Sequence, residues 1–249
     1  METLIVGAGT MGKWFGSCIN TDIAFLDTDQ QKAKNVATTV MNTTTHRVRA
    51  VKPDTEESFG LVCFAVPMSE IETAIERHAT KAQQAVIDLT GKMEDPVSLM
   101  ANIAPARERA SLHPLFHPDN APGQIAIAIQ TQGPVIDRIQ DTFRDQGYTF
   151  TEISPEEHDT AMKTIQGRTH AAILAFAMTA DSVPDGLETP VYRRLRSLMI
   201  DILDNNPEIY AEIQAEFDGA DDIAQAAAEI GTADYQQFLD MYTNVSRDT

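Results

Sequence analysis

The feature that most constrains this chain is a glycine-rich turn near its start, Gly7-Ala8-Gly9-Thr10-Met11-Gly12. An apolar run precedes the turn and a segment typical of a helix follows it, so strand, turn and helix come in that order. Gly7 permits the tight turn, Gly9 lets the backbone approach a pyrophosphate, and Gly12 lets the helix pack close to the strand. The motif predicts a dinucleotide-binding site, with Gly7, Gly9, Thr10, Met11 and Gly12 beside the phosphates.

A carboxylate stands where such a site needs one. The second strand-like run ends in Asp27, about 20 residues beyond Gly7, the spacing at which an acidic side chain reaches the ribose 2′-hydroxyl. Asp27 favours NAD over NADP, because a carboxylate would repel the extra phosphate. Another expected strand ends at Val66 before Pro67, and both residues should also face the cofactor, since ligands of such sheets bind beyond the carboxyl ends of strands. An incidental turn or a flavin site is the alternative.

Strand and helix patterns alternate up to residue 153, which predicts an α/β fold with a doubly wound Rossmann sheet over residues 1–153. The expected strands are 4–6, 23–26, 46–51, 60–66, 84–88, 110–112, 124–130 and 148–153, and the expected helices are 30–42, 70–78, 95–103 and 134–146. Ser154-Pro155-Glu156-Glu157 is a capping box with proline at the first helical position, so a long helix should begin there and run to about Asp181. Residues 154–249 are predicted to be an all-α domain, with further helix starts at Thr189-Pro190 and Asn206-Pro207.

The chain carries 37 acidic and 19 basic residues, a formal net charge of −18. This argues against nucleic acid as a partner, because phosphate contacts need clustered lysines and arginines. One interpretation is a halophilic protein, since salt screens self-repulsion; the other is an ordinary acidic enzyme. The sequence shows no membrane-spanning run and no secretory pattern, so we expect a cytoplasmic protein without membrane contact. Cys18 and Cys63 lack metal-site spacing, and we predict no metal.

A histidine follows the expected strand at 110–112. His113 would stand at the carboxyl edge of the sheet, where the nicotinamide end of the cofactor is expected, and Pro114 should end the strand there. A histidine in that place can accept a hydroxyl proton while hydride leaves the same carbon, because its pKa lies near working pH. We therefore predict His113 as a catalytic base, the alternative being a loop histidine with a local hydrogen bond; His117 is less well placed.

The long helix carries a second set of polar side chains. Spacings of four and three residues put Asp159, Lys163, Gln166 and His170 on one stripe, beside an apolar stripe. Such a stripe is commonly a solvated face. Gly167 argues against that interpretation, because glycine costs about 1 kcal/mol in a helix interior and so indicates a close approach by another group.

In these features the sequence resembles the prephenate/arogenate dehydrogenase family along nearly the whole chain. The segments that carry the resemblance are Gly7–Gly12 with Trp14-Phe15, Val66-Pro67, Ile87-Asp88-Leu89, Leu112-His113-Pro114-Leu115-Phe116, His158-Asp159, residues 165–170 and Asn206-Pro207. The His-Pro-Leu-Phe segment and the His-Asp pair, in this order behind a dinucleotide motif, are the most specific of them.

The resemblance implies an NAD(P)-dependent oxidative decarboxylation of a cyclohexadienyl acid in tyrosine biosynthesis, and with Asp27 we expect NAD as the cofactor, NADP being the alternative. Prephenate is the expected substrate and 4-hydroxyphenylpyruvate the product. It implies that His113 draws off the proton of the ring C4 hydroxyl and that His170 helps to position the substrate. His158 and Asp159 would order their helix. Loss of CO2 would aromatise the ring and supply most of the driving force. The resemblance also implies a homodimer built through the helical domain.

Two positions depart from the family pattern. The family commonly has a serine after the strand that contains the Asp-Leu pair, whereas this chain has Gly91, which leaves Thr90 as the candidate to bind the substrate hydroxyl. The family anchors a substrate carboxylate with an arginine where this chain has Asp201. The substitute must be another arginine; we favour Arg193, and the alternatives are Arg168, Arg194 and Arg196.

Other functions share parts of this pattern. An arogenate dehydrogenase would differ only in the residues that recognise an amino group instead of a keto group on the substrate side chain. A hydroxyacid dehydrogenase or imine reductase has a similar layout, but hydroxyacid dehydrogenases typically have an asparagine four residues after a helical-domain lysine, and Lys163 is followed at that distance by Gly167. A non-catalytic dinucleotide-binding protein is the third alternative.

Overall fold

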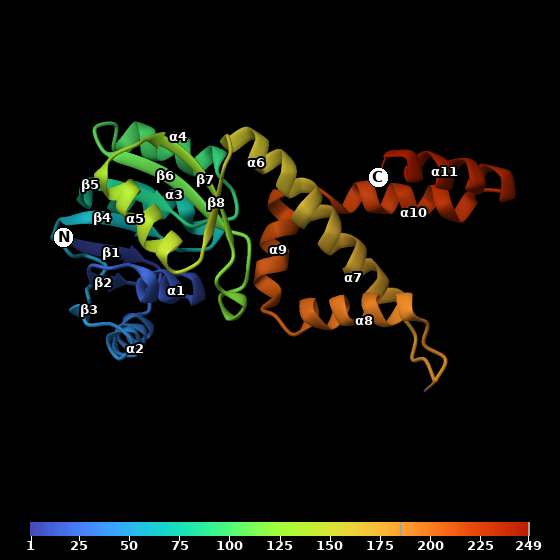
Figure 1. Cartoon of the computed structure of the whole chain (residues 1–249), viewed down its shortest axis with the longest axis horizontal. Helices are drawn as coiled ribbons and strands as arrows, with labels where there is room; N and C mark the ends of the chain where they lie inside the picture. The colour runs from blue at the N-terminus through green and yellow to red at the C-terminus, as the bar shows by residue number, and fades with distance from the viewer. Residues whose placement is uncertain (185, 249) are drawn as a thin grey trace. The chain divides into compact units, whose positions relative to one another are not determined.

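The computed structural model of the protein describes residues 1–184 and 186–248 (Figure 1). The chain divides into two compact units, residues 1–159 and the residues from 160 onward. The first unit is a sheet covered by helices, and the described residues of the second are helical apart from their connecting segments. Among the described residues, no helix is both long and apolar enough to cross a membrane.

The first unit contains one eight-stranded sheet in the order β3-β2-β1-β4-β5-β6-β7-β8 (Figure 1). All neighbouring strands are parallel except the antiparallel pair β6 and β7. The strands are β1 (Glu2–Val6), β2 (Asp22–Leu26), β3 (Val48–Ala50), β4 (Phe59–Phe64), β5 (Ala82–Asp88), β6 (Glu108–Pro114), β7 (Gln124–Thr131) and β8 (Thr149–Glu152). The chain runs outward from β1 in both directions, which confirms the predicted doubly wound Rossmann sheet.

Helices cover both faces of this sheet. One face packs against α1 (Thr10–Cys18), α2 (Gln30–Met41) and α5 (Pro134–Asp145), and the other against α3 (Ile71–His78) and α4 (Glu94–Ile103). Successive residues of a strand point to opposite faces, so Ile5 packs with the first set of helices, and Leu4 and Val6 pack with the second. Burial on both faces explains why the central strands are continuous apolar runs in the sequence.

The register of the strands brings their carboxyl ends to one edge. Val6 of β1 pairs with Phe64 of β4, Phe64 pairs with Asp88 of β5, and Asp88 pairs with Ser111 of β6. The glycine turn after β1 and the loops after β4 and β5 therefore lie along the same edge as the end of β6. Ligands of open α/β sheets bind at such an edge.

β6 extends two residues beyond its predicted end at Leu112 and ends at Pro114. The backbone N–H of Leu115 donates to the carbonyl oxygen of Gln124 at 2.9 Å, so alternate residues face β7 and the nitrogen of Pro114 faces the opposite side. On that side β5 pairs only as far as Ser111. Proline is tolerated because no neighbouring strand needs its missing N–H. His113 consequently lies within a strand, which restricts its backbone.

The predicted capping box begins the long helix. The Ser154 hydroxyl donates to Glu157 Oε2 at 2.7 Å, and the Glu157 N–H donates to Ser154 Oγ at 3.2 Å. Three segments follow one another: α6 (Pro155–Met162), a π-helical segment (Lys163–Arg168) and α7 (Thr169–Thr179). The helix thus ends two residues before the predicted end at Asp181.

The π-helical segment contains Gly167, whose close contact is with this chain's own backbone. A Cβ on Gly167 would lie 2.2 Å from the carbonyl oxygen of Phe217, and a Cβ on Gly219 would lie 2.5 Å from the backbone nitrogen of Arg168. The Gln214 side chain also donates to the Gly167 carbonyl oxygen at 2.9 Å. The close approach that the sequence indicated at Gly167 is therefore accounted for by packing inside the helical unit.

The remaining helices are α8 (Pro190–Leu203), α9 (Pro207–Glu216), α10 (Ala220–Thr232) and α11 (Tyr235–Asp248). Both predicted helix starts are confirmed, since the side chain of Thr189 accepts from the N–H of Tyr192 and that of Asn206 accepts from the N–H of Glu208. Many large apolar side chains of these helices are exposed, including Val191, Leu198 and Leu203 of α8 and Tyr235, Phe238, Tyr242 and Val245 of α11.

Candidate active site

The glycine turn has the geometry that a dinucleotide site needs. Gly7 has a φ of +104°, and a Cβ there would lie 2.2 Å from the carbonyl oxygen of Ala65, so only glycine fits. A Cβ on Gly12 would lie 2.1 Å from the carbonyl oxygen of Gly7. At Gly9, by contrast, a Cβ would meet nothing within 4 Å. Packing requires two of the glycines, and the third faces open space.

The start of α1 adds hydrogen-bond donors beside that space. Gly9 is the N-cap and supplies no side-chain cap, and the first turn, which begins with Thr10 and Met11, contains no acidic residue. The N–H groups of this turn have no acceptor within the helix. Val66 lies against the same turn, its Cγ1 3.1 Å from the Cβ position of Gly7, and Pro67 follows it, exposed. These residues fit the pyrophosphate of a dinucleotide.

Asp27 lies beside the turn at the end of β2. Its Oδ2 accepts a hydrogen bond from the Ala8 N–H at 2.8 Å, and its Oδ1 accepts one from the Asp29 N–H at 2.9 Å. Lys32 Nζ lies 3.8 Å from Oδ2. The backbone donors hold the carboxylate in one orientation, and each oxygen retains a lone pair for another donor. This arrangement fits a ribose diol.

His113 and His158 meet at the carboxyl edge of the sheet. His113 Nδ1 lies 3.0 Å from His158 Nε2, and His158 Nδ1 lies 2.7 Å from Asp159 Oδ1. His113 is 7% exposed and His158 is 0% exposed. The buried line of hydrogen bonds therefore joins β6 to α6.

The carboxylate of Asp159 also lies at the N-terminus of helix α4. It accepts hydrogen bonds from the Met93 N–H at 3.0 and 3.2 Å and from the Glu94 N–H at 3.0 Å. The partial positive charge at a helix N-terminus stabilises a carboxylate there. Asp159 thus links the start of α4 to His158.

Burial and neighbouring charge alter the proton affinity of this region. Burial, and next the neighbouring His158, lower the pKa of His113 to about 3, while Asp159 acts in the opposite direction. Burial raises the pKa of Asp88 to about 7, although hydrogen bonds from Thr90 oppose the shift. A lasting positive charge on His113 is therefore unfavourable.

Thr90 follows β5 and is buried beside this edge. Its hydroxyl lies 2.7 Å from Asp88 Oδ1 and 2.9 Å from the carbonyl oxygen of Lys92, two acceptors for one proton. Its N–H also donates to Asp88 Oδ1, at 3.1 Å. The Lys92 ammonium donates to Asp95 Oδ2 at 3.1 Å although the lysine side chain is 10% exposed. The hydroxyl proton of Thr90 is therefore engaged within its own loop.

His170, in the helical unit, packs against Tyr210 of α9. The two rings meet edge to face with centroids 5.0 Å apart and an interplanar angle of 83°. Its Nδ1 is buried and has no hydrogen-bond partner among the described residues. Burial lowers the pKa of this histidine. A neutral ring with one buried polar atom can bind a polar group that approaches it.

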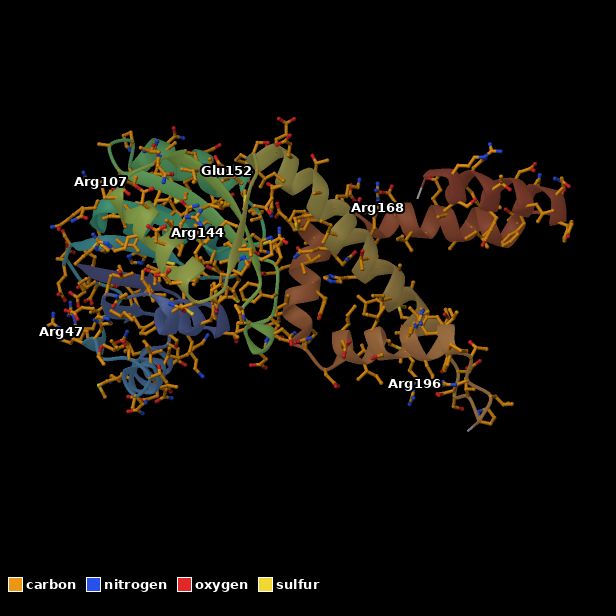
Figure 2. The ribbon with its side chains drawn as sticks, viewed as in Figure 1. Arg47, Arg107, Arg144, Glu152, Arg168 and Arg196 are labelled. Atoms are coloured by element: carbon orange, nitrogen blue, oxygen red, sulfur yellow. The ribbon has the colours of Figure 1, made fainter. Side chains whose placement is uncertain are left out.

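The predicted arginines lie in two separate clusters. Arg168 donates to Asp222 of α10 through Nε at 2.8 Å, and its terminal nitrogen lies 2.7 Å from the same carboxylate oxygen. Arg193 and Arg196 of α8 approach Glu188, at 3.8 and 3.4 Å. Figure 2 shows Arg168 and Arg196 on different helices. In the described part of the helical unit, Arg168 therefore lies in a different ion-pair cluster from Arg193 and Arg196.

Sequence reasoning missed the pairing of His113 with His158 and the burial of Asp88 and Lys92. His158 stands in the quoted His-Asp pair, but the sequence contains no signal for its contact with a residue 45 positions earlier. Asp88 ends a continuous buried strand, and this position was the available signal for its burial.

No protein-family model matches the chain. A curated Methanocaldococcus jannaschii protein named "Probable arogenate/prephenate dehydrogenase" is 24% identical over 231 residues, which cover 85% of this chain and 51% of that protein. A "4-amino-4-deoxyprephenate dehydrogenase" of Streptomyces pristinaespiralis is 25% identical over 195 residues, 70% of this chain and 64% of that protein. The solved prephenate dehydrogenase from A. aeolicus, in complex with hydroxyphenyl propionate and NAD+, matches with a TM-score of 0.70 at 16% identity, covering 100% of this chain and 91% of that one.

The chain thus spans 51% and 64% of the lengths of these two curated relatives. The match to the solved structure extends over both the sheet and the helical unit, as the sequence resemblance implies. The chain is similar in sequence to proteins named arogenate/prephenate and 4-amino-4-deoxyprephenate dehydrogenases, and it has the fold of a prephenate dehydrogenase.

Proposed function

We propose that this protein is an NAD-dependent dehydrogenase that oxidatively decarboxylates prephenate to 4-hydroxyphenylpyruvate in tyrosine biosynthesis. The observation that carries the proposal is the position of His113, a buried histidine at the sheet edge that the glycine turn also occupies. The named relatives support the class of substrate, and the NAD+ complex of the A. aeolicus enzyme supports the cofactor.

In this mechanism His113 is the base. The bound NAD supplies the acceptor for the hydride that leaves C4 of the ring. His113 takes up the C4 hydroxyl proton through Nε2, and C4 becomes a carbonyl carbon. The bond to the ring carboxylate then breaks, its electron pair aromatises the ring, CO2 leaves, and the phenolate oxygen takes the proton back. Burial around His113 keeps water away from these steps.

The substrate-binding roles are proposed from the resemblance. His170 presents a neutral ring with one buried acceptor or donor to a polar substrate group. Arg193 is our proposed carboxylate anchor because its side chain is 64% exposed and its contact with Glu188 is long, whereas Arg168 is held more closely by Asp222. Thr90 would donate its hydroxyl proton to the C4 oxygen, for which it must give up its present acceptors, Asp88 Oδ1 and the Lys92 carbonyl oxygen.

A spectrophotometric assay of NADH formation tests the function. Prephenate, arogenate and 4-amino-4-deoxyprephenate are each offered with NAD and with NADP, in dilute buffer and in molar KCl. We expect the fastest rate with prephenate and NAD, and a higher rate in KCl if the acidic surface is an adaptation to salt. Faster turnover of arogenate would identify an arogenate dehydrogenase. NADH binding without turnover of any of the three substrates would identify a non-catalytic dinucleotide-binding protein.

We also propose that the protein is a homodimer through its helical unit. Tyr235, Phe238, Leu239 and Tyr242 of α11 are each at least 40% exposed and recur at helical spacing, so they form one exposed apolar stripe of this helix. Sedimentation at micromolar concentration should give about twice the chain mass of 27.4 kDa. Tyr242→Glu should shift the equilibrium to monomer, and Gln236→Glu, a polar position outside the stripe, should not. A monomeric wild type contradicts the proposal.

A further inference from the structure

Asp159, His158 and His113 form a line of hydrogen bonds whose direction follows from chemistry. An ionised carboxylate only accepts, so the Nδ1–H of His158 donates to Asp159 Oδ1 at 2.7 Å. A neutral His158 then has a lone pair on Nε2, which accepts the 3.0 Å hydrogen bond from the Nδ1–H of His113. A neutral His113 consequently carries its lone pair on Nε2.

The opposite pattern requires a charged His158. That ring would donate from both nitrogens, and the single proton of His113 would move to Nε2. It would make Nε2 of His113 a donor, unable to take up a proton. Only the neutral pattern leaves His113 able to act as a base through Nε2.

On His158 an arriving positive charge would have a carboxylate beside it. On His113 the positive charge would be buried, and burial together with His158 lowers the pKa of that ring to about 3. On His158 the charge would lie 2.7 Å from Asp159 Oδ1. The Met93 and Glu94 N–H groups at the start of α4 also donate to that carboxylate. An ion pair with complementary hydrogen bonds tolerates burial better than an isolated charge.

We propose that His158 is a positioning and proton-accepting partner of His113. It holds His113 in the tautomer with Nε2 as acceptor, and it takes the Nδ1 proton of His113 when the substrate proton arrives at Nε2. This inference rests on the proposed function and deepens it, since the resemblance assigns His158 only the ordering of its helix.

The transfer balances in protons and charge. The O–H bond at C4 breaks as an N–H bond forms at His113 Nε2, and the Nδ1–H bond of His113 breaks as an N–H bond forms at His158 Nε2. The positive charge then lies on His158 beside Asp159. When the phenolate forms, both transfers run backwards and the proton returns to oxygen. No net proton is released by the two histidines.

Nitrogen-15 NMR of the side chains tests the tautomer without substrate, and the chain's six histidines keep the spectrum simple. The His113 signals are assigned by their loss in His113→Asn. We expect His113 to be protonated on Nδ1 in the wild type and in His158→Gln, whose amide oxygen can accept in place of the ring nitrogen. In His158→Leu this preference should be lost. A wild-type His113 protonated on Nε2 overturns the inference.

Kinetics separate proton acceptance from positioning. His158→Gln should keep the tautomer but cannot take the proton, so kcat should fall about 10- to 100-fold with little change in KM. The kcat of His158→Leu should fall further than that of His158→Gln. His78→Gln is the matched control, because His78 is a buried histidine of α3 that lies outside the site, and its kcat should be that of the wild type. An unchanged kcat in His158→Gln overturns the inference. A wild type inactive on all substrates contradicts the proposed function instead, and the NMR spectra then decide the proton positions alone.

Discussion

Replacing His113 with asparagine should lower kcat by about 10²- to 10⁴-fold, the range that a positioned general base contributes. The asparagine amide can occupy the place of Nδ1 and still donate to His158, so the buried hydrogen bond survives while Nε2 is removed. Initial rates of NADH formation from prephenate at saturating NAD measure the effect. The melting temperature should change little, because a donor of similar size remains at the buried position.

His117→Asn is the control for this substitution. His117 lies four residues further along the chain, is exposed, and interacts with Asp119, whose carboxylate oxygen is 3.5 Å away. Its loss should leave kcat and KM at the wild-type values. Near-normal turnover in His113→Asn, or an equal loss in both variants, would show that His113 is not the base.

The second large effect is expected at Gly9. Valine there should weaken NAD binding by about 10- to 100-fold, because its side chain would fill the open space and separate the pyrophosphate from one or two backbone donors, each worth about 1.5–3 kcal/mol to a charged group. The backbone of Gly9 is extended, with a φ of −79°, which valine also adopts. The fold should therefore keep its melting temperature. Titration calorimetry with NAD measures the affinity.

Gly12→Val is the contrasting variant. Its Cβ would lie 2.1 Å from the carbonyl oxygen of Gly7, so the helix must move away from the strand, which typically costs about 1–3 kcal/mol of stability. This variant should lose both melting temperature and affinity, whereas Gly9→Val should lose affinity alone. Wild-type NAD affinity in Gly9→Val would place the pyrophosphate elsewhere.

The strands and their order could be predicted because their signals are local. Continuous apolar runs such as residues 60–66 indicate strands that are buried on two faces. The capping box at Ser154 indicates a helix start through hydrogen bonds within four consecutive residues. The spacing from Gly7 to Asp27 likewise reflects one strand, one helix and one strand. Patterns of this kind depend little on the rest of the chain.

The features that the sequence did not predict depend on contacts between distant segments. Pro114 stays in its strand because β5 has already ended beside it, which is a property of register. The π-helical segment around Gly167 packs against the backbone at Phe217, which lies beyond α7, α8 and α9. The same holds for His113 and His158, since the sheet order and the direction of α6 must both be known before the two rings can be placed together.

A single carboxylate in this fold has a structural and a chemical function at once. Asp159 accepts hydrogen bonds from the N–H groups at the start of α4 and also from the Nδ1–H of His158. The start of α4 and the proton on His158 Nδ1 are therefore coupled through the same two oxygen atoms. A substitution at Asp159 would remove both sets of hydrogen bonds. A substitution at His113 or His158 would change the base and leave the hydrogen bonds at the start of α4 in place.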